Sequence, residues 1–331
     1  MNYKPPLLIY HPLFMQDTLP EESLDRAGRL ELLVEDIPFI QQLLTQAEVR
    51  EGEIHALRPQ SGEAYLSLFH TPRYIQEIKE TCENLRNQEY SSLNNTAGTF
   101  LVKESYVMAC YAVGAAVEAA KHAKQGQKAF AVVRPPGHHA HADKSDGFCI
   151  FNNIVIATEY LQRQNEKVLI IDTDLHVGDG TLSYAAENNN VFYYSLGQQQ
   201  LWPFIHQADS NNTQLEFLPE STTDEKYLQT LKETLIPTIQ QFKPDIIAVS
   251  AGFDTFAMDY VDYRDVFQGG FCLSHKVYQE LWSILDKTLI PYFAVLEGGY
   301  NPISVCTGVM TFFDKKRWTT SPLSFKVLES F

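Results

Sequence analysis

Short apolar runs that alternate with helical patterns constrain this chain more than any other feature of its sequence. A continuous apolar strand followed by a helix is typical of a parallel sheet that is covered on both faces. The pattern therefore predicts an α/β fold with a mostly parallel central sheet. The predicted strands are Leu7–Tyr10, Ala129–Val133, Val168–Ile171, Val191–Tyr194, Ile246–Val249 and Tyr292–Leu296, and the predicted helices are Ser105–Lys124, Asn153–Gln164, Thr223–Phe242 and Ser274–Asp286, with a short helix after Gly180.

The composition is that of an ordinary globular protein. Of 331 residues, 44% are hydrophobic and 20% are charged, which is enough apolar material for a full core. No linker rich in Pro, Gly or Ser interrupts the chain, and it has no internal repeat, so residues 1–331 are predicted to form a single domain. The polar stretch from Gln198 to Ser221 is expected to be a long surface loop.

The charge and the cysteines narrow the function classes. A net charge of −15 repels phosphates, which argues against nucleic acid as a direct partner and is compatible with a cationic substrate or with simple solubility. Five scattered cysteines form no Cys-x-x-Cys pair, so we expect reduced, buried thiols of a cytoplasmic protein. No stretch reads as a signal peptide or a membrane span, and the oligomeric state stays open.

Asp172, Asp174 and His176 directly follow the apolar run that ends at Ile171. Carboxylates and an imidazole at alternate positions converge if the chain turns after the strand, and Gly178 and Gly180 provide for such a turn. Such donors suit Zn²⁺ or a similar divalent ion. The alternative is a strand end with solvated acids and a helix N-cap, but the added imidazole and glycines favour a metal.

Further polar motifs follow three other predicted strands. His138 and His139 come after one of them, Asp254 after another, and Tyr300 after the last. Each has an ordinary explanation when taken alone, such as a turn, a helix N-cap or a core tyrosine. Because the carboxyl ends of parallel strands share one edge of a sheet, however, these side chains are predicted to meet in one crevice.

This constellation predicts metal-assisted hydrolysis of an amide. Asp174, His176 and Asp254 supply three metal ligands and leave coordination open for water and substrate. The two imidazoles can take and return a proton, and the hydroxyl of Tyr300 can donate to the developing oxyanion. Asp172 and Asp179 can each hold one of the imidazoles in a fixed tautomer.

The chain resembles the zinc-dependent histone deacetylase family, which includes bacterial acetylpolyamine amidohydrolases. The resemblance extends from about Leu7 to about Phe313, and it implies the three-layer arginase/deacetylase-like α/β fold with an eight-stranded, mostly parallel sheet. The segments that carry it are Arg134–Ala140, Gly147–Asn153, Asp172–Gly180, Ser250–Asp254 and Leu296–Asn301.

The resemblance also implies roles for individual residues. Asp174, His176 and Asp254 would bind one zinc ion. His138 with Asp172 and His139 with Asp179 would be the tandem histidines, the second acting as general base, and Tyr300 would polarise the carbonyl. Acetylated lysine side chains of proteins are the implied substrates, with acetylated polyamines as the alternative. Gly147, Phe148 and Trp202 would line the substrate tunnel, and Asp172, Asp174, His176, Ser195 and Leu196 would hold a structural potassium ion.

Some positions depart from the family pattern. Arg26 is a loose match to an arginine that lines an internal acetate channel. The acidic residue that clamps a peptide at the rim of many members is replaced by Gly98, with Asn94 and Asn95 nearby. The segments Trp202–Phe204 and Gly252–Phe256 resemble polyamine-type and bacterial class II members.

Two other functions remain open. One is an arginase-type ureohydrolase with two manganese ions, and the other is a non-catalytic acyl-lysine binding module. The tandem histidines and Tyr300 argue against the first. The second would be expected to lack a ligand or the tyrosine, whereas every one of these positions is filled.

Overall fold

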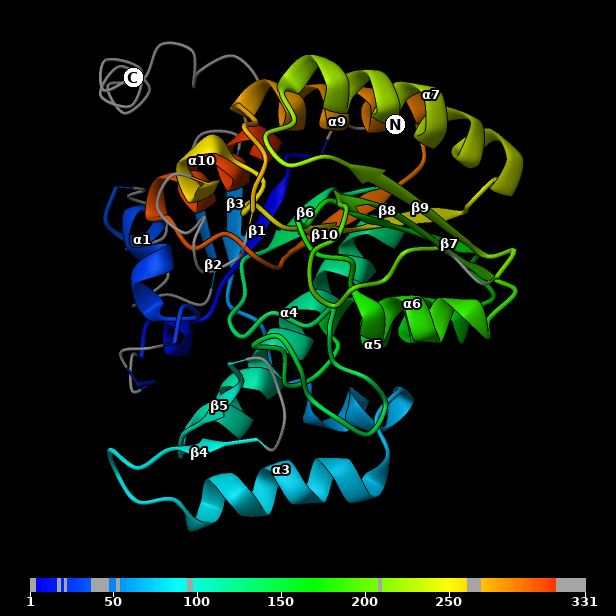
Figure 1. Ribbon diagram of the computed structural model, residues 1–331. Helices are drawn as coiled ribbons and strands as arrows, with labels where there is room; N and C mark the ends of the chain where they lie inside the picture. The colour runs from blue at the N-terminus through cyan, green and yellow to red at the C-terminus, as the bar shows by residue number, and fades with distance from the viewer. Residues whose placement is uncertain are drawn as a thin grey trace.

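A central sheet organises the protein. The computed structural model describes residues 4–16, 19–20, 23–36, 48–51, 54–93, 98–207, 210–260 and 269–313. Within these ranges one sheet has the strand order β2-β3-β1-β6-β11-β10-β7-β8-β9 (Figure 1). The strands are β1 Leu7–Ile9, β2 Glu48–Glu51, β3 Ile54–Leu57, β6 Ala129–Ala131, β7 Val168–Asp172, β8 Val191–Gln198, β9 Thr213–Leu218, β10 Ile246–Ala251 and β11 Tyr292–Leu296.

Eight of these strands, from β3 to β9 in the spatial order, pair in parallel, which confirms the predicted eight-stranded parallel sheet. The ninth strand, β2, adds to β3 in the antiparallel direction at one edge. In the centre, Asp172 at the end of β7 is in register with Ser250 of β10 on one side and with Ser195 of β8 on the other. The carboxyl ends of the central strands therefore lie together.

Helices cover both faces of the sheet (Figure 1). On one side lie α4 Ser105–Lys124, α5 Asn153–Gln162 and α6 Asp179–Ala186, and on the other α7 Asp224–Phe242, α9 His275–Thr288 and α10 Pro302–Phe313. Below the first layer lies α3 Pro72–Asn84, next to the two-stranded pair β4 Ser91–Ser92 and β5 Phe100–Leu101. The remaining elements are α1 Glu31–Asp36 and the short 3₁₀ helices Pro12–Met15, Ala27–Leu30 and Glu63–Leu68.

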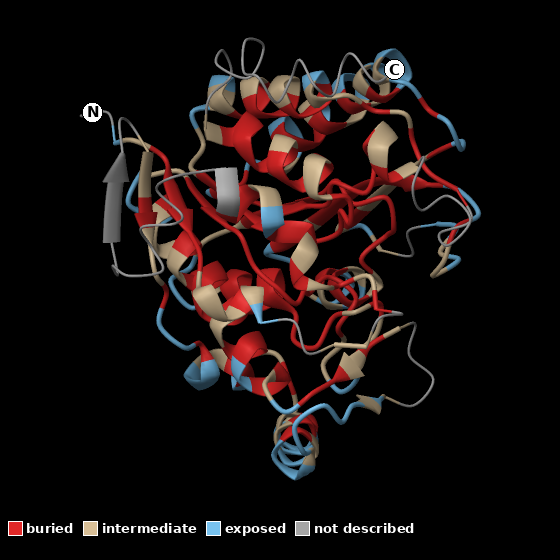
Figure 2. Cartoon of the chain, turned by 90° about the vertical axis from the view of Figure 1, so that its left-hand side faces the viewer, coloured by how far each residue is buried: buried red, intermediate tan, exposed pale blue. Residues whose placement is uncertain are grey.

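Local sequence explains where these elements begin and what they bury. The Asn152 side chain accepts a hydrogen bond from the Val155 N–H at the start of α5, and the Ser274 side chain accepts one from the Lys276 N–H at the start of α9. All residues of β7, β10 and β11 are buried, and Figure 2 shows the buried interior between the helical layers. Full burial of one Val, Leu or Ile side chain contributes about 1.5–3 kcal/mol, so the continuous apolar strands dominate the core.

One sequence prediction about the fold was wrong. The stretch from Gln198 to Ser221 is not an unstructured loop throughout, because Thr213–Leu218 forms strand β9 at the edge of the sheet. The four middle residues of β9 are only half-buried, so the strand lacks the continuous apolar run that marks the central ones. Its alternation of polar Gln214 and Glu216 with apolar Leu215 and Phe217 was the available signal.

The cysteines and the helices bear on two further predictions. Cys82, Cys110, Cys149 and Cys306 are buried free thiols, as predicted, whereas Cys272 is only half-buried.

Among the helices of the described residues, none has both the length and the apolar character that crossing a membrane requires.

Candidate active site

The predicted metal ligands lie together at the carboxyl end of the sheet. Ligand atoms of Asp174, His176 and Asp254 all lie within 4.8 Å of one another, and the three residues are buried. The His176 Nδ1 atom is 3.2 Å from Asp174 Oδ1 and 3.1 Å from Asp254 Oδ2. One imidazole nitrogen thus faces a carboxylate oxygen from each of two strand ends.

The backbone around this cluster is adapted to its carboxylates. The Leu175 N–H donates to Asp254 Oδ1 at 3.0 Å, and the Gly298 N–H donates to Asp174 Oδ2 at 2.8 Å. A Cβ atom at Gly298 would lie 2.5 Å from Asp174 Oδ2 and 2.8 Å from Asp254 Oδ2. Only glycine lets the chain approach so closely, which explains the glycine after Glu297.

The charges in this cluster favour a bound cation. Burial, and then the charge of Asp174, raise the pKa of Asp254. Burial lowers the pKa of His176, but its hydrogen bonds to Asp174 and Asp254 outweigh this and raise it to about 9. Two buried carboxylates repel each other, and a single imidazolium offsets this electrostatic cost only in part. A divalent ion bound between the carboxylates would offset the rest. The donor set of two oxygens and one nitrogen fits Zn²⁺.

The tandem histidines each contact a different carboxylate. His138 Nδ1 lies 3.0 Å from Asp172 Oδ2, which also accepts a hydrogen bond from the Tyr193 hydroxyl at 2.8 Å. His139 Nδ1 lies 2.8 Å from Asp179 Oδ1. Because an ionised carboxylate only accepts hydrogen bonds, the Nδ1 proton of each imidazole lies on the side of its aspartate. Nε2 of a neutral imidazole is then free to act as a base.

The two imidazoles differ in their electrostatic environment. Burial lowers the pKa of His138, but the nearby charges of Asp174 and Asp172 outweigh it, so the pKa is raised overall. Burial and the charge of His138 lower the pKa of His139. The arrangement therefore favours a charged first imidazole and a neutral second one.

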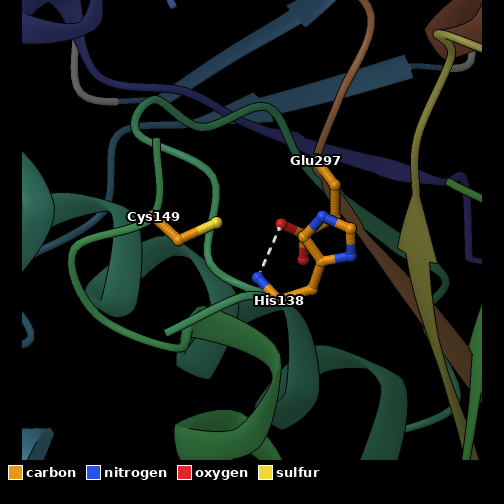
Figure 3. A group of neighbouring side chains, drawn as sticks. All are labelled: His138, Cys149 and Glu297. Atoms are coloured by element: carbon orange, nitrogen blue, oxygen red, sulfur yellow. Dashed lines mark hydrogen bonds between the residues drawn. The ribbon is translucent and has the colours of Figure 1, made fainter. Parts of the chain in front are cut away.

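Glu297 is a buried residue of the site for which the sequence predicts no role. Its Oε2 atom accepts hydrogen bonds from the Gly137 and His138 N–H groups at 2.7 and 3.1 Å, and its Oε1 atom accepts one from the Ser250 hydroxyl at 3.0 Å. Figure 3 shows Glu297 beside His138, with the Cys149 thiol nearby. Burial raises the pKa of Glu297 to about 7. An acidic residue directly after a buried strand was the signal that could have identified it.

Tyr300 lies against Arg29 and Phe148. The Arg29 guanidinium lies 5.6 Å from the centre of the tyrosine ring, and its Nη1 donates to the carbonyls of Glu297 and Gly299. The contacts of Arg29 with this turn were not predicted, because a buried arginine cannot be told from an exposed one by its residue type. Burial raises the pKa of Tyr300 well above its usual value, so the phenol stays protonated and able to donate.

Aromatic rings surround this cluster. The Trp202 ring lies 4.6 Å from the His139 ring, and the Phe148 ring lies 5.6 Å from the Tyr300 ring, measured between ring centres. Gly147 adopts a φ of +50°, and a Cβ atom there would lie 2.7 Å from the Trp202 ring and 2.5 Å from the His139 ring. A larger residue at Gly147 would displace one of these rings, so the glycine sets the spacing of the predicted wall.

One of the predicted potassium ligands, Ser195, carries a buried hydroxyl that is unsatisfied within the described residues. The Ser195 hydroxyl is fully buried and has no hydrogen-bond partner within the described part of the chain. It lies on β8 in register with Asp172 of β7, and Leu196 is the next residue. A buried oxygen without a hydrogen-bond partner is compatible with a bound monovalent cation. Asp172, Asp174 and His176 would be further ligands of that cation.

Of the residues predicted at the rim of the substrate tunnel, only Gly98 lies within the described residues. Asn94 and Asn95 lie outside the described residues. Gly98 adopts a φ of +67°, and a Cβ atom there would lie 2.6 Å from the Phe148 ring. Gly98 therefore allows close packing against Phe148, at the position that matches the peptide-clamping acidic residue of many family members.

Comparison with known proteins places these features in a family. The model of the histone deacetylase domain matches residues 25–315. Histone deacetylase 10, chloroplastic, of Oryza sativa subsp. japonica is 32% identical over 79% of this chain and 62% of its own length. The polyamine deacetylase HDAC10 of Danio rerio is 28% identical over 74% of this chain and 38% of its own length. The chain thus spans less than two thirds of the length of these relatives.

A solved structure agrees with this comparison. The crystal structure of the HDA15 HD domain superposes with a TM-score of 0.78 at 25% identity, covering 92% of this chain and 89% of that one. The fold is therefore the arginase/deacetylase fold that the resemblance implied. With the family model matching most of its length, the chain belongs to the histone deacetylase family.

Proposed function

We propose that this protein is a zinc-dependent deacetylase that removes acetyl groups from the ε-amino group of acetyl-lysine in proteins. The observation that carries the proposal is the convergence of the ligand atoms of Asp174, His176 and Asp254, within 4.8 Å of one another, beside His139. When bound, the metal would lower the pKa of a water molecule and polarise the substrate carbonyl.

The surrounding side chains would perform the proton transfers. His139, with its Nδ1 proton directed to Asp179, offers Nε2 to remove a proton from the attacking water and later returns it to the leaving amine. His138, whose pKa is raised, would stabilise negative charge as it develops. The Tyr300 hydroxyl would donate a hydrogen bond to the oxyanion, and it stays protonated because it is buried.

The aromatic side chains beside the site and the net charge of the protein favour particular substrates. Phe148 and Trp202 offer contact area without demanding hydrogen bonds, which suits an alkyl chain that ends in an acetamide. Gly98 cannot supply a carboxylate to fix a peptide backbone, so we expect weak discrimination among peptide sequences. The net charge of −15 favours cationic substrates. The similarity to a polyamine deacetylase makes acetylated polyamines the second candidate.

A second ion accompanies this proposal. The buried Ser195 hydroxyl without a partner supports a structural potassium ion held with Asp172, Asp174, His176 and Leu196. Such an ion would fix the segment that carries two of the zinc ligands.

A substrate panel tests the proposed activity. The zinc-loaded protein is assayed with acetyl-lysine peptides of varied flanking sequence, with acetylputrescine and with acetylspermidine, and Asp254→Asn serves as the inactive control. We expect hydrolysis of all peptides with similar kcat/KM. Cleavage of polyamines alone would move the assignment to polyamine deacetylation, and two transition metals per active chain would favour the ureohydrolase.

A further inference from the structure

A third histidine follows the tandem pair, and the proposed function gives it no role. His141 lies two residues after His139, in the segment between β6 and α5. Its side chain is 21% exposed, whereas that of His139 is 4% exposed. The segment thus carries a buried imidazole and a more accessible one.

Both imidazoles contact the same carboxylate. His139 Nδ1 lies 2.8 Å from Asp179 Oδ1, and His141 Nε2 lies 3.0 Å from Asp179 Oδ2. The hydroxyl of Ser183, one turn further along α6, lies 3.3 Å from His141 Nδ1. Each carboxylate oxygen of Asp179 is therefore engaged by a different ring, and the outer ring is itself contacted from α6.

The charge of Asp179 fixes the direction of both hydrogen bonds. Burial raises the pKa of Asp179, but the hydrogen bonds from His139 and His141 outweigh burial and hold it well below its ordinary value. The carboxylate is therefore ionised and can only accept, so both ring nitrogens donate to it. His139 then carries its proton on Nδ1, which leaves Nε2 as the basic atom.

The second imidazole restricts the rotation of the carboxylate. The Asp179 side chain is 14% exposed. Without a protein donor, Oδ2 would accept hydrogen bonds from water. The carboxylate could then satisfy its hydrogen bonds in more than one orientation. Two donors on opposite oxygens leave one orientation, and that orientation sets the plane of the His139 ring.

We propose that His141 is a positioning residue that fixes the general base His139 through Asp179. The proposal rests on the proposed deacetylase function for its effect on turnover. Its structural part, the effect of His141 on the His139 ring, does not depend on the substrate. The main-chain hydrogen bond from the His141 N–H to the Lys144 carbonyl shapes the loop whatever the side chain, so substitution of the ring leaves that bond available.

The first experiment compares two substitutions of the same residue. His141→Ala should lower kcat roughly tenfold, the scale on which an outer partner of a site residue acts, with KM and zinc content unchanged. His141→Gln should restore most of the loss, because the Gln Nε2 can donate near the position of the His Nε2. His122→Ala is the matched control, since His122 is a half-buried histidine hydrogen-bonded to Gln127, and it should keep the wild-type kcat.

A double-mutant cycle separates positioning from general damage to the loop. If His141 acts through Asp179, His141→Ala should have no further effect on kcat in an Asp179→Ala background. An equal fold-loss in both backgrounds, or a wild-type kcat for His141→Ala, would overturn the proposal.

A spectroscopic measurement keeps the inference testable even if the protein has no deacetylase activity. In protein labelled with ¹⁵N-histidine, the Nδ1–H proton of His139, identified by its loss in His139→Gln, should shift in His141→Ala and return in His141→Gln. An unchanged His139 signal in His141→Ala would reject the positioning role. Lack of turnover in the wild type, with the shift present, would reject only the proposed function.

Discussion

Asp259 accepts a hydrogen bond from the main-chain N–H of Tyr300 at 2.6 Å. The same oxygen, Oδ1, accepts a second hydrogen bond from the N–H of Asn301 at 3.1 Å. Asp259 is 1% exposed and follows Asp254 by five residues, so a buried carboxylate from the segment after β10 holds the turn after β11. The position of the Tyr300 hydroxyl therefore depends on a contact between two strand ends.

Removal of this contact should reduce turnover. Asp259→Ala removes the acceptor of two main-chain N–H groups and loosens the turn that carries Tyr300, so we expect kcat to fall by at least tenfold, equivalent to about 1.4 kcal/mol in the barrier. Zinc content, measured by elemental analysis, should stay at one per chain. If Asp259→Ala lowers kcat by a further tenfold in the Tyr300→Phe variant, Asp259 does not act through the Tyr300 hydroxyl.

Asp259 should also make stability depend on pH. Burial raises its pKa in the folded protein to about 7, above the ordinary value of 3.8, so between these pH values the folded state binds more protons than the unfolded state. The free energy of unfolding must then fall as pH rises through this window and level off above it. Asp259→Asn lacks this contribution, so its stability relative to wild type should increase from pH 4 to pH 7 in urea denaturation. A constant difference across that range would contradict the prediction.

The hydroxyl of Tyr300 should matter for chemistry and little for metal binding. Loss of one preorganised oxyanion donor typically costs about 10²–10³ in kcat. We expect this loss for Tyr300→Phe in a steady-state assay, with unchanged zinc content and unchanged affinity for a metal-binding inhibitor. A Phe variant that turns over at the wild-type rate would remove Tyr300 from the proposed mechanism.

The two tandem histidines should differ in importance. His139 combines a lowered pKa with the contact to Asp179, whereas the pKa of His138 is raised. His139→Ala removes the proposed base, and its kcat should be at least as low as that of His138→Ala. The reverse order in single-turnover rates would interchange the two roles.

The metal ligands should link stability to zinc. An ion that binds only the folded state stabilises it by about 2.7 kcal/mol when present at 100 times its dissociation constant. Chelation should therefore lower both activity and the melting temperature of the wild type, and Zn²⁺ or Co²⁺ should restore them. Asp254→Asn should bind little zinc, and its melting temperature should not respond to chelation. Equal responses of the two proteins in a thermal scan would show that the stabilising ion lies elsewhere.

The sequence alone predicted the layers of the fold and the grouping of three candidate metal ligands. Continuous apolar runs such as Val168–Ile171, alternating with helical patterns, indicate central strands, and the carboxyl ends of parallel strands share an edge. Asp174 and His176 follow one such strand and Asp254 follows another, so these side chains are predicted to meet, and their ligand atoms do lie together. The edge strand β9 was not predicted, because its half-buried residues do not form a continuous apolar run.

Tertiary structure decided which polar residues outside these motifs reach the site. Arg29 and Asp259 belong to residue types that are mostly exposed, and His141 lies just outside the motif segment Arg134–Ala140. Their partners are Gly299, Tyr300 and Asp179, which lie 38 or more residues away along the chain. Local sequence governs secondary structure through periodicity and capping, but a hydrogen bond between distant strand ends depends on how the whole sheet and its loops pack.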